Sequence, residues 1–129
     1  MLMSAEIILE LYCKTPTDFQ LQRVERALAV TYPVPITAFL SDVFIDTQRA
    51  VGIVIGHDDP GQYEQRADGH IFQSTAIRKL WKAGRYWVAS TDEGRYVLTS
   101  FLKVVGRKSL RALIEQAVRP FDSVPNEGG

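Results

Sequence analysis

The segment RYWVASTDEGRYVLTSF, residues 85–101, contains two runs that are rich in β-branched and aromatic residues. Asp92-Glu93-Gly94 separates the two runs, and a short loop that contains glycine is typical of the turn in a β-hairpin. We therefore predict antiparallel strands over 85–91 and 95–101. This hairpin is the clearest strand signal in the chain, and it indicates a domain built on an antiparallel sheet.

The length of the loop decides which side chains share a face of this hairpin. A three-residue loop places Trp87 opposite Thr99 and Val88 opposite Leu98. One face then holds the candidate binding residues Arg85, Trp87, Arg95 and Phe101. The other face holds the expected core residues Tyr86, Val88, Tyr96 and Leu98.

Helices are predicted on both sides of the strand-rich region. After the hairpin, apolar residues recur at helical spacing, and Pro120 is expected to end that helix. The recurring residues are Leu110, Leu113, Ile114, Ala117 and Val118. Before the strands, Thr15-Pro16-Thr17-Asp18 supplies an N-cap, a proline at the first helical position and an acidic residue in the first turn. A helix is therefore predicted to start there and to stop before Pro33.

Strand patterns occupy most of the remaining chain. Residues 5–13 alternate between apolar and polar side chains, which is typical of a strand with one buried face. Further strands are expected over 42–46, 50–55 and 70–80. The predicted order is therefore strand, helix, several strands, helix. The fold class that fits this order is α+β, with a mostly antiparallel sheet and two helices packed on one of its faces.

Length and composition bound the domain organisation. The 129 residues are 46% hydrophobic and 23% charged, with a formal net charge of +0. These values are ordinary for a globular chain and exclude a disordered or disulfide-stapled one. We expect one compact domain over 1–119 and a flexible C-terminal tail over 120–129. The single cysteine, Cys13, and the lack of a long uncharged apolar run favour a cytoplasmic protein without a membrane segment.

The neutral total hides an uneven distribution of charge along the chain. Residues 1–77 carry five basic and ten acidic residues, whereas residues 78–119 carry ten basic and three acidic ones. Charge asymmetry of this kind indicates an anionic partner. Aromatic residues lie among these cations, and exposed rings beside Lys and Arg suit single-stranded nucleic acid. The predicted partner is therefore a nucleic acid or an acidic protein surface.

Six residues of this basic half form the candidate anion-binding site. They combine the proposed binding face of the hairpin with the start of the last helix, where free backbone amides favour anions. The candidates are Arg85, Trp87, Arg95, Arg107, Lys108 and Arg111. No residue is predicted to be catalytic, and neither a cofactor nor a bound metal is expected. The predicted function is that of a small non-enzymatic binding or regulatory protein.

Two alternatives stay open. The basic half of one copy can pair with the acidic half of another, which would make the chain a self-associating module such as a homodimer. The second alternative is a small metal-dependent hydrolase, because imidazole and carboxylate groups are ligands for divalent metals. Its candidate ligands are His57, Asp59 and His70, although Asp-rich segments of this kind are more typical of solvated turns.

Overall fold

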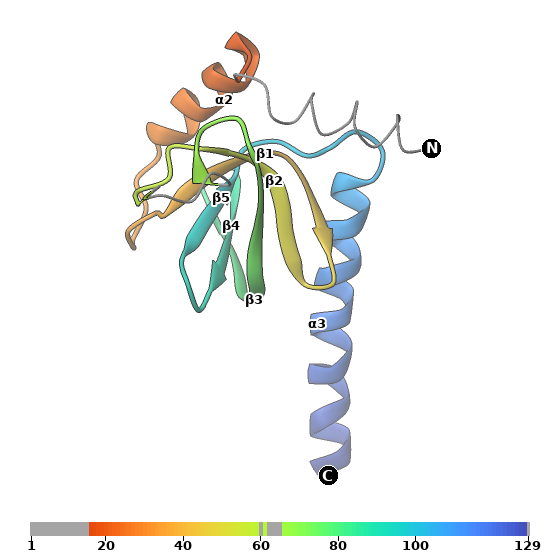
Figure 1. Ribbon diagram of the computed structural model, residues 1–129. Helices are drawn as coiled ribbons and strands as arrows, with labels where there is room; N and C mark the ends of the chain where they lie inside the picture. Colours follow the sequence, from red (N-terminus) through yellow and green to blue (C-terminus); the bar gives the residue numbers. More distant parts are fainter. Residues whose placement is uncertain (1–15, 60, 62–65, 129) are drawn as a thin grey trace.

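Figure 1 shows the computed structural model, which describes residues 16–59, 61 and 66–128. In this part of the chain, helix α2 (Asp18–Leu28) comes first, five strands follow, and helix α3 (Gly106–Gly128) comes last. The strands are β1 (Ala38–Asp46), β2 (Arg49–Ile55), β3 (Ile71–Ala83), β4 (Tyr86–Thr91) and β5 (Arg95–Leu98). The α+β class is confirmed. The predicted order does not match, because the described chain begins with a helix; the strand expected over 5–13 lies outside the described residues.

The predicted mostly antiparallel sheet is confirmed, and its five strands close into a barrel. Consecutive strands pair antiparallel, and β1 pairs parallel with β5 through residues 38–40 and 96–98. The register of β1 shifts between Ser41 and Phe44, and a similar irregularity interrupts β3. Such irregularities bend strands and increase their twist, which allows closure. Closure in turn pairs the two edges that an open sheet leaves exposed.

Two clusters of buried residues hold the barrel and α2 together. The first cluster includes Leu40 and Leu98, which line the inside of the barrel. In the second cluster, Val24 and Ala27 of α2 pack against strand residues that include Val97. β5 contributes to both clusters because neighbouring residues of a strand point to opposite faces. The second cluster therefore fixes α2 against the outer surface of the barrel.

The β4–β5 hairpin is confirmed, but its register differs by one residue from the prediction. Trp87 pairs with Leu98 rather than with Thr99. The Thr91 amide donates a hydrogen bond to the Gly94 carbonyl oxygen at 2.8 Å, so residue 91 lies opposite 94 rather than 95. The Thr91 hydroxyl also accepts hydrogen bonds from two successive amides of the turn, at 3.1 Å each. A slip of one residue exchanges the two faces of a strand.

This shift regroups the side chains of the hairpin. Trp87 packs against the first cluster, which contains Tyr96. Val88 and Val97 belong to the second cluster and pack beneath α2. Arg95 precedes Tyr96 and so points to the opposite face from Trp87. The predicted face that combined Trp87 with Arg95 is therefore wrong.

Gly106 allows the first turn of α3 to sit directly against the barrel. A Cβ atom at this position would lie 2.5 Å from the Val43 carbonyl oxygen and 2.8 Å from the Phe101 Cβ. One turn further on, Ser109 Oγ accepts a hydrogen bond from the Ile45 amide at 2.8 Å. The start of α3 is thus anchored to β1.

α3 continues beyond Pro120 to Gly128 and projects past the barrel (Figure 1). The prediction that this helix ends at Pro120 is wrong, because the helix continues through Pro120 despite the lost N–H donor and the clash with the preceding turn that a proline introduces. The division into a domain over 1–119 and a tail over 120–129 stays a prediction. Neither described helix contains an apolar stretch long enough to cross a bilayer.

Candidate anion-binding pocket

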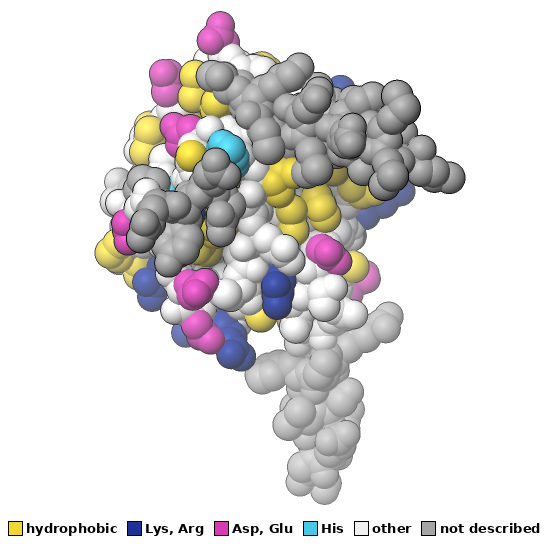
Figure 2. Space-filling view, viewed as in Figure 1, with side chains coloured by type: hydrophobic (Ala, Val, Ile, Leu, Met, Phe, Trp, Pro, Cys, Tyr) yellow, Lys and Arg dark blue, Asp and Glu magenta, His cyan; other side chains and the backbone are white. Residues whose placement is uncertain are grey.

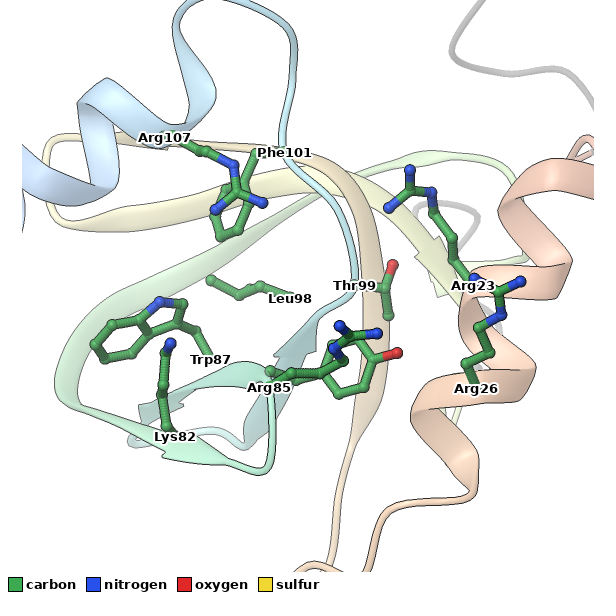
Figure 3. A pocket seen from close by; sticks show the side chains of 10 residues that line it. Arg23, Arg26, Lys82, Arg85, Trp87, Leu98, Thr99, Phe101 and Arg107 are labelled. Atoms are coloured by element: carbon green, nitrogen blue, oxygen red, sulfur yellow. The ribbon is translucent and has the colours of Figure 1, made fainter.

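A cavity of about 310 Å³ lies where α2, the β3–β4 hairpin, β5 and the start of α3 meet (Figure 3). We call it the basic pocket. Its lining residues are Arg23, Arg26, Lys82, Arg85, Tyr86, Trp87, Leu98, Thr99, Phe101 and Arg107. The fold therefore brings side chains from the first and the last described helix to one place.

The basic pocket concentrates positive charge. Five of its ten lining residues are cations, and none of these ten described residues is Asp or Glu. The five cations form no salt bridge within the described part of the chain, whereas Arg78, outside the pocket, pairs with Asp92 at 3.0 Å. On the face shown in Figure 2, basic and acidic side chains are intermixed. Like charges gathered without a counter-charge repel one another, so the pocket is suited to an anion.

Aromatic rings position two of the cations. Lys82 Nζ lies 5.2 Å from the centre of the Trp87 ring. The guanidinium carbon of Arg107 lies 4.9 Å from the centre of the Phe101 ring. A cation held over a ring face gains electrostatic attraction without being neutralised. Both side chains therefore keep their full charge for a ligand.

Arg23 is the half-buried cation of the pocket, and the other four are exposed. Its guanidinium carbon lies 4.5 Å from the centre of the Phe19 ring. Its Nε atom is buried and has no hydrogen-bond partner in the described part of the chain. Buried donors without partners are rare and unfavourable. This unpaired donor belongs to a residue that lines the basic pocket.

Two neutral residues of the pocket wall, Leu98 and Thr99, offer a ligand no free donor. Leu98 is 1% exposed, and Thr99 beside it is 6% exposed. The Thr99 hydroxyl donates a hydrogen bond to the Leu40 carbonyl oxygen at 2.9 Å. The donors left for a ligand are therefore those of the surrounding cations and of the Tyr86 and Trp87 side chains.

Three of the six residues predicted from the sequence line the basic pocket, namely Arg85, Trp87 and Arg107. Arg95 instead lines a separate cavity with Trp81, since the register shift turns it to the other face. Lys108 and Arg111 are exposed on α3 and do not line the pocket. The structure thus brings together half of the predicted site.

Sequence reasoning misses three of the cations, Arg23, Arg26 and Lys82. Arg23 and Arg26 belong to the acidic half of the chain, and α2 carries them to the pocket. Their spacing of three residues places them on neighbouring positions of one helix face, beside the apolar residues that pack on the barrel. This spacing is the signal that identifies a basic edge on α2. The pocket is therefore not built from the basic C-terminal half alone.

The metal-site alternative gains no support from the described geometry. No group of three His, Cys, Asp or Glu side chains is placed to hold a metal ion within residues 16–59, 61 and 66–128. His57 Nδ1 accepts a hydrogen bond from the Asp59 amide at 3.0 Å, and the ring lies 5.8 Å from that of Phe72. Burial and the charge of Arg66 lower the pKa of His57, against a smaller opposing effect of the nearby carboxylates. The burial and contacts of the His57 ring therefore account for its neutral state without a bound metal.

Comparison of the chain with protein-family models, with curated proteins and with solved structures found no match. Function therefore has to be inferred from the geometry of the basic pocket.

Proposed function

We propose that this protein is a cytoplasmic, non-enzymatic binding protein whose basic pocket binds phosphate of a single-stranded nucleic acid. The observation that carries the proposal is the convergence of five cations and three aromatic rings on one cavity, without an acidic residue among its described lining. Cations neutralise phosphates, and accessible rings provide surfaces on which bases stack.

A single-stranded nucleic acid fits these features better than an acidic protein surface does. Carboxylates of a protein would match the cations but would leave the rings in the pocket wall without a planar partner. Tyr86 and Trp87 are both half-buried there. A single strand presents phosphates and bases next to each other, so one ligand can contact both the cations and the aromatic rings of the pocket wall.

The salt dependence of oligonucleotide binding tests the proposal. A labelled single-stranded thymidine oligonucleotide should bind the full chain, with an affinity measured by fluorescence anisotropy. The logarithm of the affinity should fall linearly with the logarithm of salt concentration, with a slope of roughly −3 for four or five phosphate contacts. Combining Arg23→Glu with Arg107→Glu should weaken binding by about tenfold or more and flatten this slope.

The matched control combines Arg49→Glu with Lys103→Glu. Both residues are exposed and neither lines the basic pocket, so the net charge changes equally while the pocket is intact. No binding at low salt, or an equal loss in this control, contradicts the proposal. If the protein instead forms oligomers in analytical ultracentrifugation that the pocket variant abolishes, self-association replaces it.

A further inference from the structure

The basic pocket holds more positive charge than one internal phosphate of a strand can balance. Each internal phosphodiester carries about one negative charge. A terminal phosphomonoester carries about −1.5 to −2 near pH 7 and offers three strong acceptor oxygens. Five cations surround a single cavity of about 310 Å³. This density of charge fits the more highly charged phosphate group.

The cations also reach the pocket from different sides. Arg23 and Arg26 come from α2, Lys82 and Arg85 come from the β3–β4 hairpin, and Arg107 comes from α3 (Figure 3). A groove that follows a continuous backbone has its cations arranged along the strand. Cations that surround a volume instead suit a terminal phosphate, whose three free oxygens point in different directions.

Arg23 provides a separate observation that points to the same group. A guanidinium binds phosphate through two parallel hydrogen bonds, and Nε can donate one of them. The Nε atom of Arg23 is buried and lacks a partner among the described residues, while Phe19 packs against the guanidinium. This donor is therefore positioned before any ligand binds.

We propose that the basic pocket recognises a terminal phosphomonoester of a nucleotide, either at the end of a strand or in a free nucleotide. This inference rests on the proposed function and names the group that the pocket selects. Tyr86 and Trp87 in the same wall are where the adjoining base packs.

A set of four probes separates this inference from the proposed function. They are a single-stranded thymidine decamer with a 5′ phosphate, the same decamer with a 3′ phosphate, the decamer with hydroxyl ends, and free thymidine monophosphate. Affinities for the full chain are measured at one salt concentration. At least one phosphate-ended decamer should bind about tenfold more tightly than the hydroxyl-ended one, as expected for additional charged hydrogen bonds.

Arg23→Lys is the diagnostic variant, because it keeps the positive charge and removes the Nε donor. It should abolish most of the advantage of the phosphate-ended decamer and leave binding of the hydroxyl-ended decamer nearly unchanged. Arg49→Lys is the matched control, and it should preserve the advantage. Circular dichroism verifies that both variants are folded.

The outcomes distinguish the two proposals. Equal affinity for phosphate-ended and hydroxyl-ended decamers, or an advantage that survives in Arg23→Lys, overturns the terminal-phosphate inference and leaves the proposed function standing. Tight binding of thymidine monophosphate without binding of any decamer supports the inference with a free nucleotide as ligand, and it overturns the proposed function. Absence of binding to all four probes overturns both.

Discussion

The guanidinium carbon of Arg107 lies 4.9 Å from the centre of the Phe101 ring. Phe101 forms a bridge with Val43 of β1, and Arg107 is the second residue of α3. Gly106 leaves the space that α3 needs to approach both Val43 and Phe101. The placement of one cation in the basic pocket therefore depends on how α3 docks on the barrel.

Replacing Phe101 by Leu should weaken oligonucleotide binding without changing its salt dependence. The change removes a cation–π contact of roughly 0.5–1 kcal/mol, which corresponds to a two- to fivefold loss of affinity. All cations remain, so the slope of log affinity against log salt should stay the same. Anisotropy titrations at several salt concentrations measure both quantities. Phe101→Tyr, which keeps the ring face, is the control, and a flatter slope in Phe101→Leu would contradict this account of the Arg107 contact.

Gly106→Ala should destabilise the protein, because the added Cβ atom would lie 2.5 Å from the Val43 carbonyl oxygen. Neighbouring backbone cannot move aside cheaply, so we expect a loss of about 1–3 kcal/mol in the free energy of unfolding. Gly56→Ala is the comparison, since Gly56 has a φ of +67° but 3.9 Å of clearance to its nearest neighbour. It should lose only about 1 kcal/mol, from backbone strain alone. Urea unfolding measures both, and equal losses would show that steric contact at Gly106 does not matter.

The elements of the fold that depend on nearby residues are predictable from the sequence. The capping residues before α2 and the apolar spacing of α3 identify the two helices, and the turn at 92–94 identifies the hairpin. Barrel closure is not predictable in this way, because residues 38–40 pair with residues 96–98 far along the chain. The hairpin register depends on a single turn in which the Thr91 hydroxyl binds two amides. Composition gives no indication of that contact.

The residues of the candidate site also divide into those that local sequence features identify and those that only the packing of the fold brings to the pocket. Arg85, Trp87 and Arg107 belong to segments whose charge and aromatic content mark them directly. Arg23 and Arg26 reach the pocket because the residue that follows each of them packs on the barrel. These two residues are Val24 and Ala27. Docking of an amphipathic helix is decided by the surface it covers, which no local pattern in the helix specifies.

Val104→Asn should stabilise the protein. Val104 has a φ of +71°, and 78% of the residue is exposed. A β-branched side chain is strained in this left-handed region, whereas Asn tolerates it. Since little buried surface is lost, we expect a gain of about 0.5–1 kcal/mol and a melting temperature higher by a few degrees. Differential scanning calorimetry measures the change, with Val105→Asn as the control because Val105 has no positive φ. An unchanged or lower melting temperature in Val104→Asn would argue against strain in this loop.

The stability of the protein should fall as the pH drops below the ordinary pKa of histidine, and His57 should be one cause. Burial, followed by the charge of Arg66, lowers the pKa of His57 from 6.5, so the unfolded chain binds a proton more readily than the folded one. Protonation therefore favours unfolding, and this contribution to stability is complete above pH 6.5 and is lost toward the lower folded pKa. One group contributes at most about 1.4 kcal/mol per pH unit. Urea unfolding between about pH 5 and 6.5, above the main carboxyl titrations, should show a smaller slope in His57→Gln than in the original chain. His70→Gln is the control that removes the other histidine, and a slope in His57→Gln equal to that of the original chain would exclude His57 as a source of the pH dependence.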